Sequence, residues 1–174
     1  QINNATPHSI SEESYFEIIT HKTASLFMAC VEMGAYASGA TPEQLDIMRR
    51  FALLFGQCFQ IKDDIFDYFH SDSLGKPTGN DLREGKVTLP LIYALNATGH
   101  PRCAEMNELV SHDRLSDEEI ATLIGYAIEA GGIEYADATL MRLRDEAAAV
   151  LSSLGDVDTT PLLSLLDYII ARDM

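Results

Sequence analysis

The stretch GQCFQIKDDIFD, residues 56–67, decides the fold expected of this chain. On a helix, which turns by about 100° per residue, its three aspartates fall with Gln60 inside an arc of about 100°. These aspartates are Asp63, Asp64 and Asp67. The opposite arc is apolar and collects Phe51, Leu54, Phe55, Phe59, Ile61, Ile65 and Phe66. A helix with this much apolar surface is anchored in a core, so its acidic stripe must face something polar.

The acidic stripe itself indicates a cation. Three carboxylates on one helical face repel each other unless a positive charge neutralises them. Gly56 lies in the same arc and leaves room for a ligand to approach the backbone. The alternative is a solvated acidic face, which is common in a chain of net charge −15. Because the stripe is narrow and flanked by aromatic residues, the pattern favours a divalent-cation site.

The composition bounds the class of protein. The chain has 174 residues, enough for one domain, and 47% of them are hydrophobic. Its apolar runs are shorter than a transmembrane helix requires, so we expect no membrane span. Twenty-seven acidic residues against twelve basic ones argue against a nucleic-acid partner. Cys30, Cys58 and Cys103 have no metal-ligand spacing, and they are expected to be reduced core thiols of a cytoplasmic protein.

Apolar spacing and capping signals predict an all-α chain. The expected helices cover residues 11–38, 41–69, 81–98, 102–111, 116–132, 133–154 and 160–170. Capping boxes are expected at Ser9/Glu12, Thr41/Gln44, Asp81/Glu84 and Ser116/Glu119. Pro90 is expected to kink the helix that contains it. Residues 70–80 are rich in turn formers and are expected to form a loop.

Lys22 is the second feature that points to a site. It lies at the centre of an apolar stripe, which on a helix contains Tyr15, Ile18, Ile19, Leu26, Ala29 and Met33. A lysine in that position is rarely buried without an anionic partner. The alternative is that the stem packs against the stripe and the ammonium group reaches solvent. The spacing alone does not decide between the two, and Thr23 beside it could supply a hydroxyl group.

Lys76 and Lys86 follow the acidic stripe. Lys76 lies in the expected loop, and Lys86 lies in the helix expected after it. Each alone would be interpreted as a surface lysine. Carboxylates and lysines around one pocket, however, suit a metal-bound phosphate, because the metal bridges carboxylate and phosphate oxygens while ammonium groups take the remaining charge.

These residues carry a resemblance to a known family. The segment FQIKDDIFDY (residues 59–68) resembles the second aspartate-rich motif of the trans-polyprenyl diphosphate synthases. KTASLF (residues 22–27) resembles the lysine-threonine motif upstream of it. Residues 74–91 resemble the segment downstream of it, with a sequence typical of the longer-chain enzymes. The three motifs occur in family order over residues 15–95. Residues 96–174 match only in helical character.

The resemblance implies a fold and a reaction. Family members are all-α bundles of the isoprenoid synthase type around a deep cavity, usually homodimers. They join an allylic diphosphate to isopentenyl diphosphate with Mg²⁺ as cofactor. By this resemblance, Asp63 is the direct magnesium ligand, Asp64 and Asp67 act through metal-bound water, and Asp81 lies in an outer shell. The leaving diphosphate is held by Lys22, Lys76 and Lys86. The carbocation is stabilised by Thr23 and Gln60.

One departure from the family pattern shapes the expectation. The family has a first aspartate-rich motif followed by paired arginines, and these 174 residues contain no second aspartate cluster of that spacing and no comparable arginines, since Arg49 and Arg50 follow a different pattern. Residues 1–174 are therefore expected to be the C-terminal portion of a single synthase domain, inactive by itself. Two alternatives stay open, a terpene cyclase of the same fold and a non-catalytic partner subunit. The residue spacing around Lys86 resembles that of chain-elongating enzymes, and this resemblance argues against the cyclase.

Overall fold

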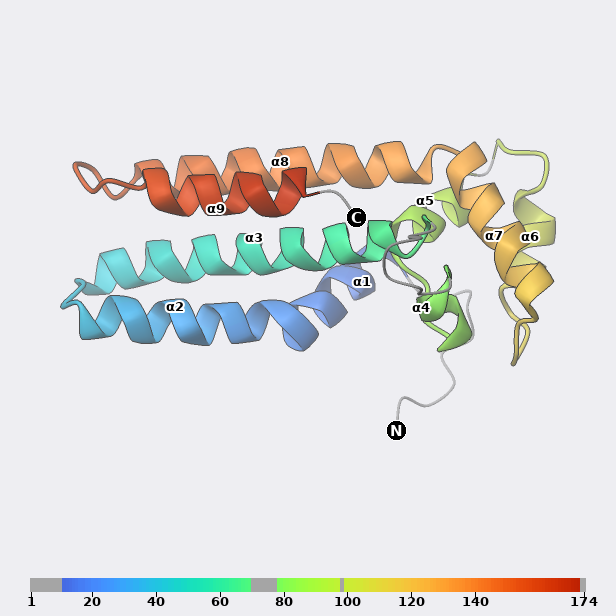
Figure 1. Cartoon of the computed structure of the whole chain (residues 1–174), viewed down its shortest axis with the longest axis horizontal. Coiled ribbons are helices and arrows are strands. Elements are labelled where there is room, and N and C mark those ends of the chain that lie inside the picture. The colour runs from blue at the N-terminus through green and yellow to red at the C-terminus, as the bar shows by residue number, and fades with distance from the viewer. Residues whose placement is uncertain (1–10, 70–77, 98, 173–174) are drawn as a thin grey trace. The chain divides into compact units, whose positions relative to one another are not determined.

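The described part of the chain is built from helices and their connections (Figure 1). The computed structural model describes residues 11–69, 78–97 and 99–172, and no strand occurs among them. The elements are α1 (Glu12–Ile19), the π-helical turn η2 (Thr20–Ala24), α2 (Ser25–Ala37), α3 (Pro42–Phe66), α4 (Asn80–Arg83), α5 (Leu89–Asn96), α6 (Cys103–Leu109), α7 (Asp117–Glu129), α8 (Gly132–Ser152) and α9 (Thr160–Ala171). The predicted all-α class is confirmed.

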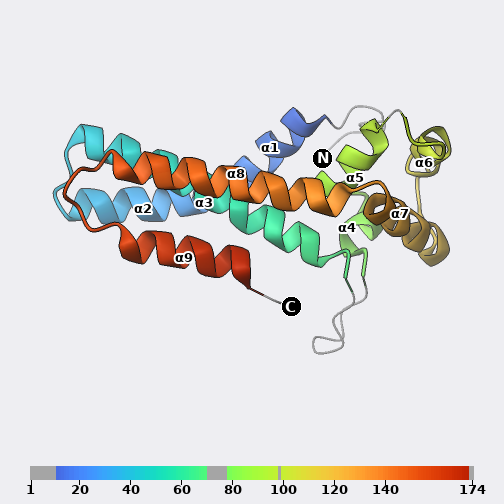
Figure 2. The same cartoon turned by 90° about the horizontal axis from the view of Figure 1, so that it is seen from above.

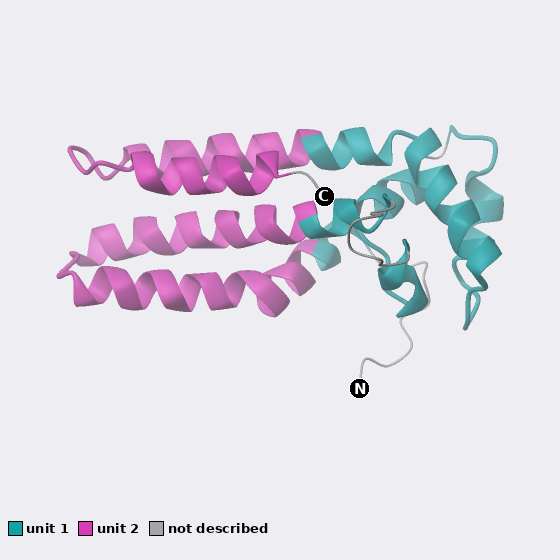
Figure 3. Ribbon diagram, viewed as in Figure 1, with its two compact units in different colours: residues 1–15, 63–137, 174 teal, residues 16–62, 138–173 magenta. Residues whose placement is uncertain are grey.

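The chain divides into two compact units (Figure 3). Unit 1 contains residues 1–15 and 63–137 together with residue 174, and unit 2 contains residues 16–62 and 138–173. Both long helices, α3 and α8, contribute one part to each unit. Asp63, Asp64 and Asp67 belong to unit 1, whereas most of α3 belongs to unit 2.

Unit 2 contains α2, most of α3, most of α8, and α9, which run alongside one another (Figures 1 and 2). Ion pairs link successive neighbours: Arg49 with Glu32 on α2, Arg50 with Glu146 on α8, and Arg144 on α8 with Asp167 on α9. These pairs are largely exposed and contribute little. The stability of the unit comes from apolar side chains that are at most 5% exposed, namely Phe51, Leu54, Cys58, Ile61, Leu140, Leu143, Leu151 and Leu166.

Unit 1 packs α5, α6 and α7 around a second apolar core. Leu91, Met106 and Leu123 are fully buried in it. The Tyr126 hydroxyl group donates a 2.7 Å hydrogen bond to the Ala94 carbonyl oxygen, which ties α7 to the end of α5. A buried tyrosine needs such a partner for its hydroxyl group.

Two predicted capping boxes are confirmed. At the start of α3, the Thr41 amide donates to Gln44 Oε1 at 2.9 Å, and the Gln44 amide donates to Thr41 Oγ1 at 3.3 Å. Ser116 and Glu119 form the reciprocal pair that begins α7. The box predicted at Ser9 falls outside the described residues.

The predicted helix from residue 81 to the break near Gly99 is wrong. The structure has a short α4 and a separate α5, with Gly85 between them at φ 72°. Thr88 is extended and caps α5, so Pro90 lies in the first turn of α5, where its missing N–H costs nothing, and it makes no kink. The cap predicted at Asp81 is also wrong, because α4 begins one residue earlier.

Two further predictions need correction. Residues 12–37 run through a π-helical turn instead of one uninterrupted α-helix. Of the three cysteines, Cys58 is buried and Cys103 is half-buried, but Cys30 is exposed, so it is not a core thiol in the described structure. All three thiols are free.

Candidate functional site

The three carboxylates of the acidic stripe lie in three different environments. Asp63 is exposed, Asp64 is 3% exposed, and Asp67 is half-buried. The helical period explains the difference, because residues 63 and 64 point about 100° apart and only one of them can face the core. Of the three carboxylates in the predicted stripe, one is therefore exposed and the other two pack against the protein.

Asp64 is held by a tyrosine that the sequence analysis did not assign to the site. The Tyr15 hydroxyl group on α1 donates a 2.6 Å hydrogen bond to Asp64 Oδ2. Burial and then the Asp64 charge raise the pKa of Tyr15 well above its ordinary value, so the hydroxyl group stays protonated and remains a donor. The sequence offered one signal for this contact. Tyr15 is the only tyrosine in the apolar stripe of Lys22, and a buried tyrosine hydroxyl group requires a partner.

Asp67 contacts the backbone of α4. Its Oδ1 accepts a hydrogen bond from the Asn80 amide and its Oδ2 accepts one from the Asp81 amide, each at 3.0 Å. One residue along the chain, Tyr68 and Thr88 share a 3.0 Å hydrogen bond between their hydroxyl groups, both buried. The end of α3 is thereby joined to the segment that the sequence predicted to follow the loop.

Lys86 lies near Asp81 and Glu84. The distance from Lys86 Nζ to Asp81 Oδ1 is 3.8 Å, and Lys86 also pairs with Glu84. The hydrogen bond with Glu84, together with the nearby negative charges, keeps the pKa of Lys86 above its ordinary value. Lys86 is exposed, so its ammonium group is reachable from solvent.

Unit 2 holds the predicted Thr23 and Gln60 together. The Thr23 hydroxyl group donates a 2.6 Å hydrogen bond to Gln60 Oε1. A second bond of the same kind lies one turn away, where Gln57 Nε2 donates to Thr20 Oγ1 at 3.1 Å. Both threonines belong to η2, and π-helical turns of this kind are frequent at functional sites. The sequence offered a signal for the second pair, because Thr20 and Thr23 are three residues apart, as are Gln57 and Gln60.

Gly56 allows these two segments to approach. A Cβ atom at residue 56 would lie 2.5 Å from the Ala24 Cα atom and 3.2 Å from the Phe27 ring. The expectation that Gly56 leaves room for a ligand is therefore wrong, because the backbone of η2 fills that space. The glycine brings η2 close to α3, and this closeness lets both threonine–glutamine hydrogen bonds form.

Lys22 is exposed on η2. Three apolar residues of its stripe are exposed as well, Ile18 by 54%, Leu26 by 67% and Met33 by 65%, whereas Tyr15 and Ile19 of the same stripe are each 3% exposed. Lys76 falls outside the described residues. The convergence of Lys22 and Lys76 with the acidic stripe stays a prediction.

The described residues do not form a metal centre by themselves. Within the described ranges, no three His, Cys, Asp or Glu side chains converge closely enough to hold an ion. The physical reason lies in the stripe itself, since Asp64 is hydrogen-bonded to Tyr15 and Asp67 to the backbone of α4. Mg²⁺ commonly takes several of its oxygen ligands from water and phosphate.

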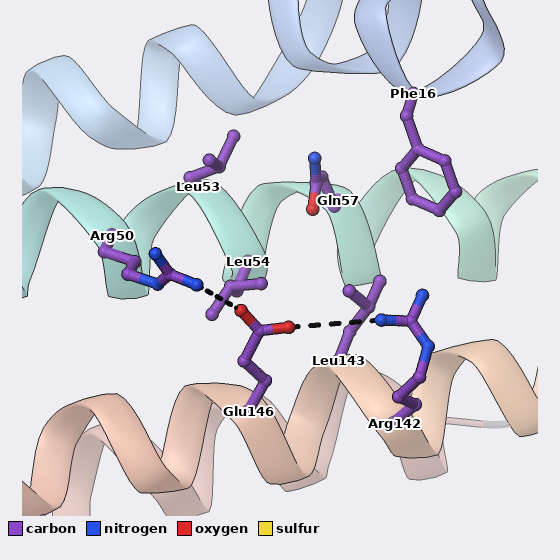
Figure 4. Close-up of a pocket in the computed structure, with 8 residues that line it drawn as sticks. All are labelled: Phe16, Arg50, Leu53, Leu54, Gln57, Arg142, Leu143 and Glu146. Carbon is purple, nitrogen blue, oxygen red and sulfur yellow. Dashed lines mark hydrogen bonds and ion pairs between the residues drawn. The ribbon is translucent and has the colours of Figure 1, made fainter. Parts of the chain in front are cut away.

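A pocket of about 330 Å³ lies elsewhere, in unit 2 (Figure 4). Apolar residues of α1, α3 and α8 form its walls: Phe16, Leu53, Leu54 and Leu143. Gln57 also lines it, and two arginines, Arg50 and Arg142, stand near Glu146 at 2.6 and 4.0 Å. Because Glu146 pairs with both arginines, the three charged side chains that line the pocket carry a net charge of +1. In the part of the chain that the structure describes, no helix is both long and apolar enough to cross a bilayer.

Comparison with known proteins identifies the family. Residues 1–127 match the family model described as polyprenyl synthetase. The chain is 36% identical to nonaprenyl diphosphate synthase of Mycobacterium tuberculosis, over 93% of this chain and 49% of that protein. It is 31% identical to octaprenyl diphosphate synthase of Escherichia coli, over 99% of this chain and 54% of that protein. The chain thus spans about half the length of these curated relatives.

Solved structures agree with this assignment. The crystal structure of geranylgeranyl pyrophosphate synthase from Bacteroides thetaiotaomicron matches with a TM-score of 0.86 and 40% identity, over 99% of this chain and 55% of that one. A polyprenyl synthase from Caulobacter crescentus, complexed with calcium and isoprenyl diphosphate, matches with a TM-score of 0.86 and 32% identity, over 100% of this chain and 54% of that one. The chain belongs to the polyprenyl synthetase family.

Proposed function

We propose that the protein carrying this chain is a magnesium-dependent prenyltransferase, which condenses an allylic diphosphate with isopentenyl diphosphate. The observation that carries the proposal is the hydrogen bond between Thr23 and Gln60. It fixes two oxygen dipoles on segments whose sequence resembles the family's cation-stabilising residues. Fixed dipoles are effective against charge that exists only transiently, such as an allylic carbocation.

The residues near Asp63 suit a metal-bound diphosphate. Asp63 presents an exposed carboxylate, a hard oxygen ligand of the kind that Mg²⁺ prefers. Asp64 and Asp67 would contact metal-bound water, and Asp81 would lie in an outer shell. When bound, the metal would supply positive charge against the departing diphosphate. Calcium and isoprenyl diphosphate in the Caulobacter crescentus relative support a divalent cation at such a site.

Three lysines would hold the leaving diphosphate, namely Lys22, Lys76 and Lys86. Lys86 is exposed and Asp81 lies beside it, so its ammonium group has a fixed neighbour before a ligand arrives. Ammonium groups complement the phosphate oxygens that the metal leaves uncovered. Loss of diphosphate then leaves the carbocation facing Thr23 and Gln60, and attack by the double bond of isopentenyl diphosphate with loss of a proton completes the transfer.

The location and the assembly belong to the same proposal. Three free thiols support a cytoplasmic location, since oxidising compartments favour disulfides. A homodimer is proposed from the resemblance to the family. Sedimentation of the purified protein tests it, and a monomer at micromolar concentration would contradict it.

The test is a prenyl-transfer assay on the purified protein that contains these residues. It is incubated with Mg²⁺, farnesyl diphosphate and labelled isopentenyl diphosphate. We expect a longer labelled prenyl diphosphate, which disappears with EDTA. Asp63→Ala should lower kcat by several orders of magnitude, and Asp67→Ala should lower it less. A hydrocarbon product without use of isopentenyl diphosphate would indicate a cyclase, and no turnover under any of these conditions would contradict the proposal.

A further inference from the structure

Asp67 accepts hydrogen bonds from three successive backbone amides. Its two carboxylate oxygens accept the amides of Asn80 and Asp81, and its own carbonyl oxygen accepts the Gly79 amide at 2.9 Å. Residues 79–81 are twelve or more positions away in the sequence. The contact is therefore tertiary, and it fixes where the chain returns to the end of α3.

The anchored segment needs such support. α4 has four residues, far fewer than a helix requires to persist by itself in water. The first amides of any helix have no partner within that helix, and here the Asp67 carboxylate supplies one for two of them. Its negative charge also suits the positive end of the helix dipole.

Contacts with α7 hold the other side of the same segment. A Cβ atom at residue 79 would lie 2.4 Å from the Ile120 side chain, and Gly79 has φ 76°, so glycine alone fits there without strain. Arg83 of α4 pairs with Asp117 of α7 at 2.8 Å. α4 is thus fixed between the Asp67 carboxylate and α7.

The anchor reaches Lys86 through Asp81. The Asp81 carbonyl oxygen accepts the Lys86 amide at 2.8 Å, and Asp81 Oδ1 lies 3.8 Å from Lys86 Nζ. Asp67 fixes the Asp81 amide, and the Asp81 carbonyl group fixes the Lys86 backbone. The Lys86 ammonium group pairs with Glu84 and also lies near the Asp81 carboxylate. Release of the Asp67 carboxylate would therefore loosen the segment that carries both acidic partners of Lys86.

We propose that Asp67 acts chiefly as a positioning residue, which holds α4 and thereby sets the place of Lys86. The inference goes beyond the proposed function, and it rests on that function only where Lys86 binds the diphosphate. It gives Asp67 a different role from Asp63, because both carboxylate oxygens of Asp67 already accept backbone amides.

The first experiment measures hydrogen exchange of the amides in residues 79–86 of the purified protein. Asp67→Ala should raise the exchange rates of the Asn80 and Asp81 amides at least tenfold. Asp67→Asn keeps one oxygen acceptor and should expose one of the two amides, which covers the case in which the alanine variant does not fold. Asp63→Asn is the control and should leave both amides protected. Unchanged exchange in both Asp67 variants would overturn the proposal.

The second experiment separates positioning from a general loss of stability. KM for the allylic diphosphate is compared among Asp67→Asn, Lys86→Met and the double variant. If Asp67 acts through Lys86, the double variant should be no worse than Lys86→Met alone, because coupled residues are not additive. Multiplied effects would overturn the proposal. If the unmodified protein transfers no prenyl group, the proposed function fails, and the exchange rates still decide the positioning.

Discussion

The Tyr15 hydroxyl group donates a 2.6 Å hydrogen bond to Asp64 Oδ2, and each of the two side chains is only 3% exposed. A buried carboxylate is costly to leave without hydrogen bonds, and a bond to a charged group contributes more than one between neutral groups. Tyr15 thus fixes the Asp64 side chain, and it joins α1 to the acidic part of α3.

Removing this hydroxyl group should destabilise the protein. We expect Tyr15→Phe to lower the free energy of unfolding by about 1–3 kcal/mol, because the Asp64 carboxylate loses a short hydrogen bond while the ring keeps its packing. Urea denaturation measures the change. Tyr36→Phe is the control, since Tyr36 is 76% exposed, and it should have no measurable effect. Equal stability of the two variants would show that the bond contributes nothing.

Gly56 permits a contact that alanine would block. Because a Cβ atom would lie 2.5 Å from backbone of Ala24, Gly56→Ala should lower stability by about 1–3 kcal/mol. Thermal unfolding measures the loss. The matched control is Gly125→Ala in α7, where an added Cβ meets nothing within 4 Å, so the higher helix propensity of alanine should stabilise by about 0.5–1 kcal/mol. The same sign for both variants would contradict the steric argument.

The buried Cys58 thiol should make stability fall in alkaline solution. Burial raises its pKa from 9.0 to about 12, against an opposing effect of the Arg142 charge. Above pH 9.0 the unfolded state loses a proton that the folded state keeps, so this contribution is complete below pH 9.0 and is lost as pH rises towards 12. The slope attributable to one such group is at most about 1.4 kcal/mol per pH unit.

Cysteine variants isolate that contribution. Cys58→Ala should flatten the decline of stability between pH 9 and 11, measured by urea denaturation at each pH. Burial also raises the pKa of Tyr126 to about 12, so part of the decline should remain. Cys30→Ala removes an exposed thiol and serves as the control with an unchanged slope. A Cys58→Ala slope equal to that of the unmodified protein would refute the assignment.

The sequence predicted those features that depend on local rules. The boundaries of α3 and α7 follow from Thr41/Gln44 and Ser116/Glu119, whose capping signals lie within four residues. The resemblance named Thr23 and Gln60 as site residues, but it did not predict the hydrogen bond between them, which spans 37 positions. The capping signals, in contrast, require no knowledge of distant contacts.

The features that were missed depend on residues far apart in the sequence. The short α4 is held by Asp67 and α7, so a local capping pattern at Asp81 gave the wrong helix. Tyr15 contacts Asp64 across 49 positions, and no periodicity predicts that pairing. Gly56 was expected to face a ligand, because the acidic residues in the same arc suggested one. The space beside it is instead filled by Ala24, which lies on η2.

The last prediction compares the two threonine–glutamine pairs. Thr23→Val removes the hydroxyl group that fixes Gln60 while nearly preserving volume. If these oxygen dipoles stabilise the carbocation, kcat should fall by about 10–100-fold, with little change in KM for either diphosphate, because the lost interaction acts in the transition state and not in substrate binding. Thr23→Ser keeps the hydroxyl group and should restore most of kcat.

Thr20→Val is the matched control for that change. It removes the equivalent bond to Gln57 one turn away, with a similar loss of buried hydrogen bonding, but at a position without a proposed role in the chemistry. Thermal unfolding should therefore report similar losses of stability for the two valine variants, while steady-state kinetics should separate them. If Thr20→Val lowered kcat as much as Thr23→Val, the effect would come from the packing of η2 against α3, and the electrostatic role of Thr23 would have to be abandoned.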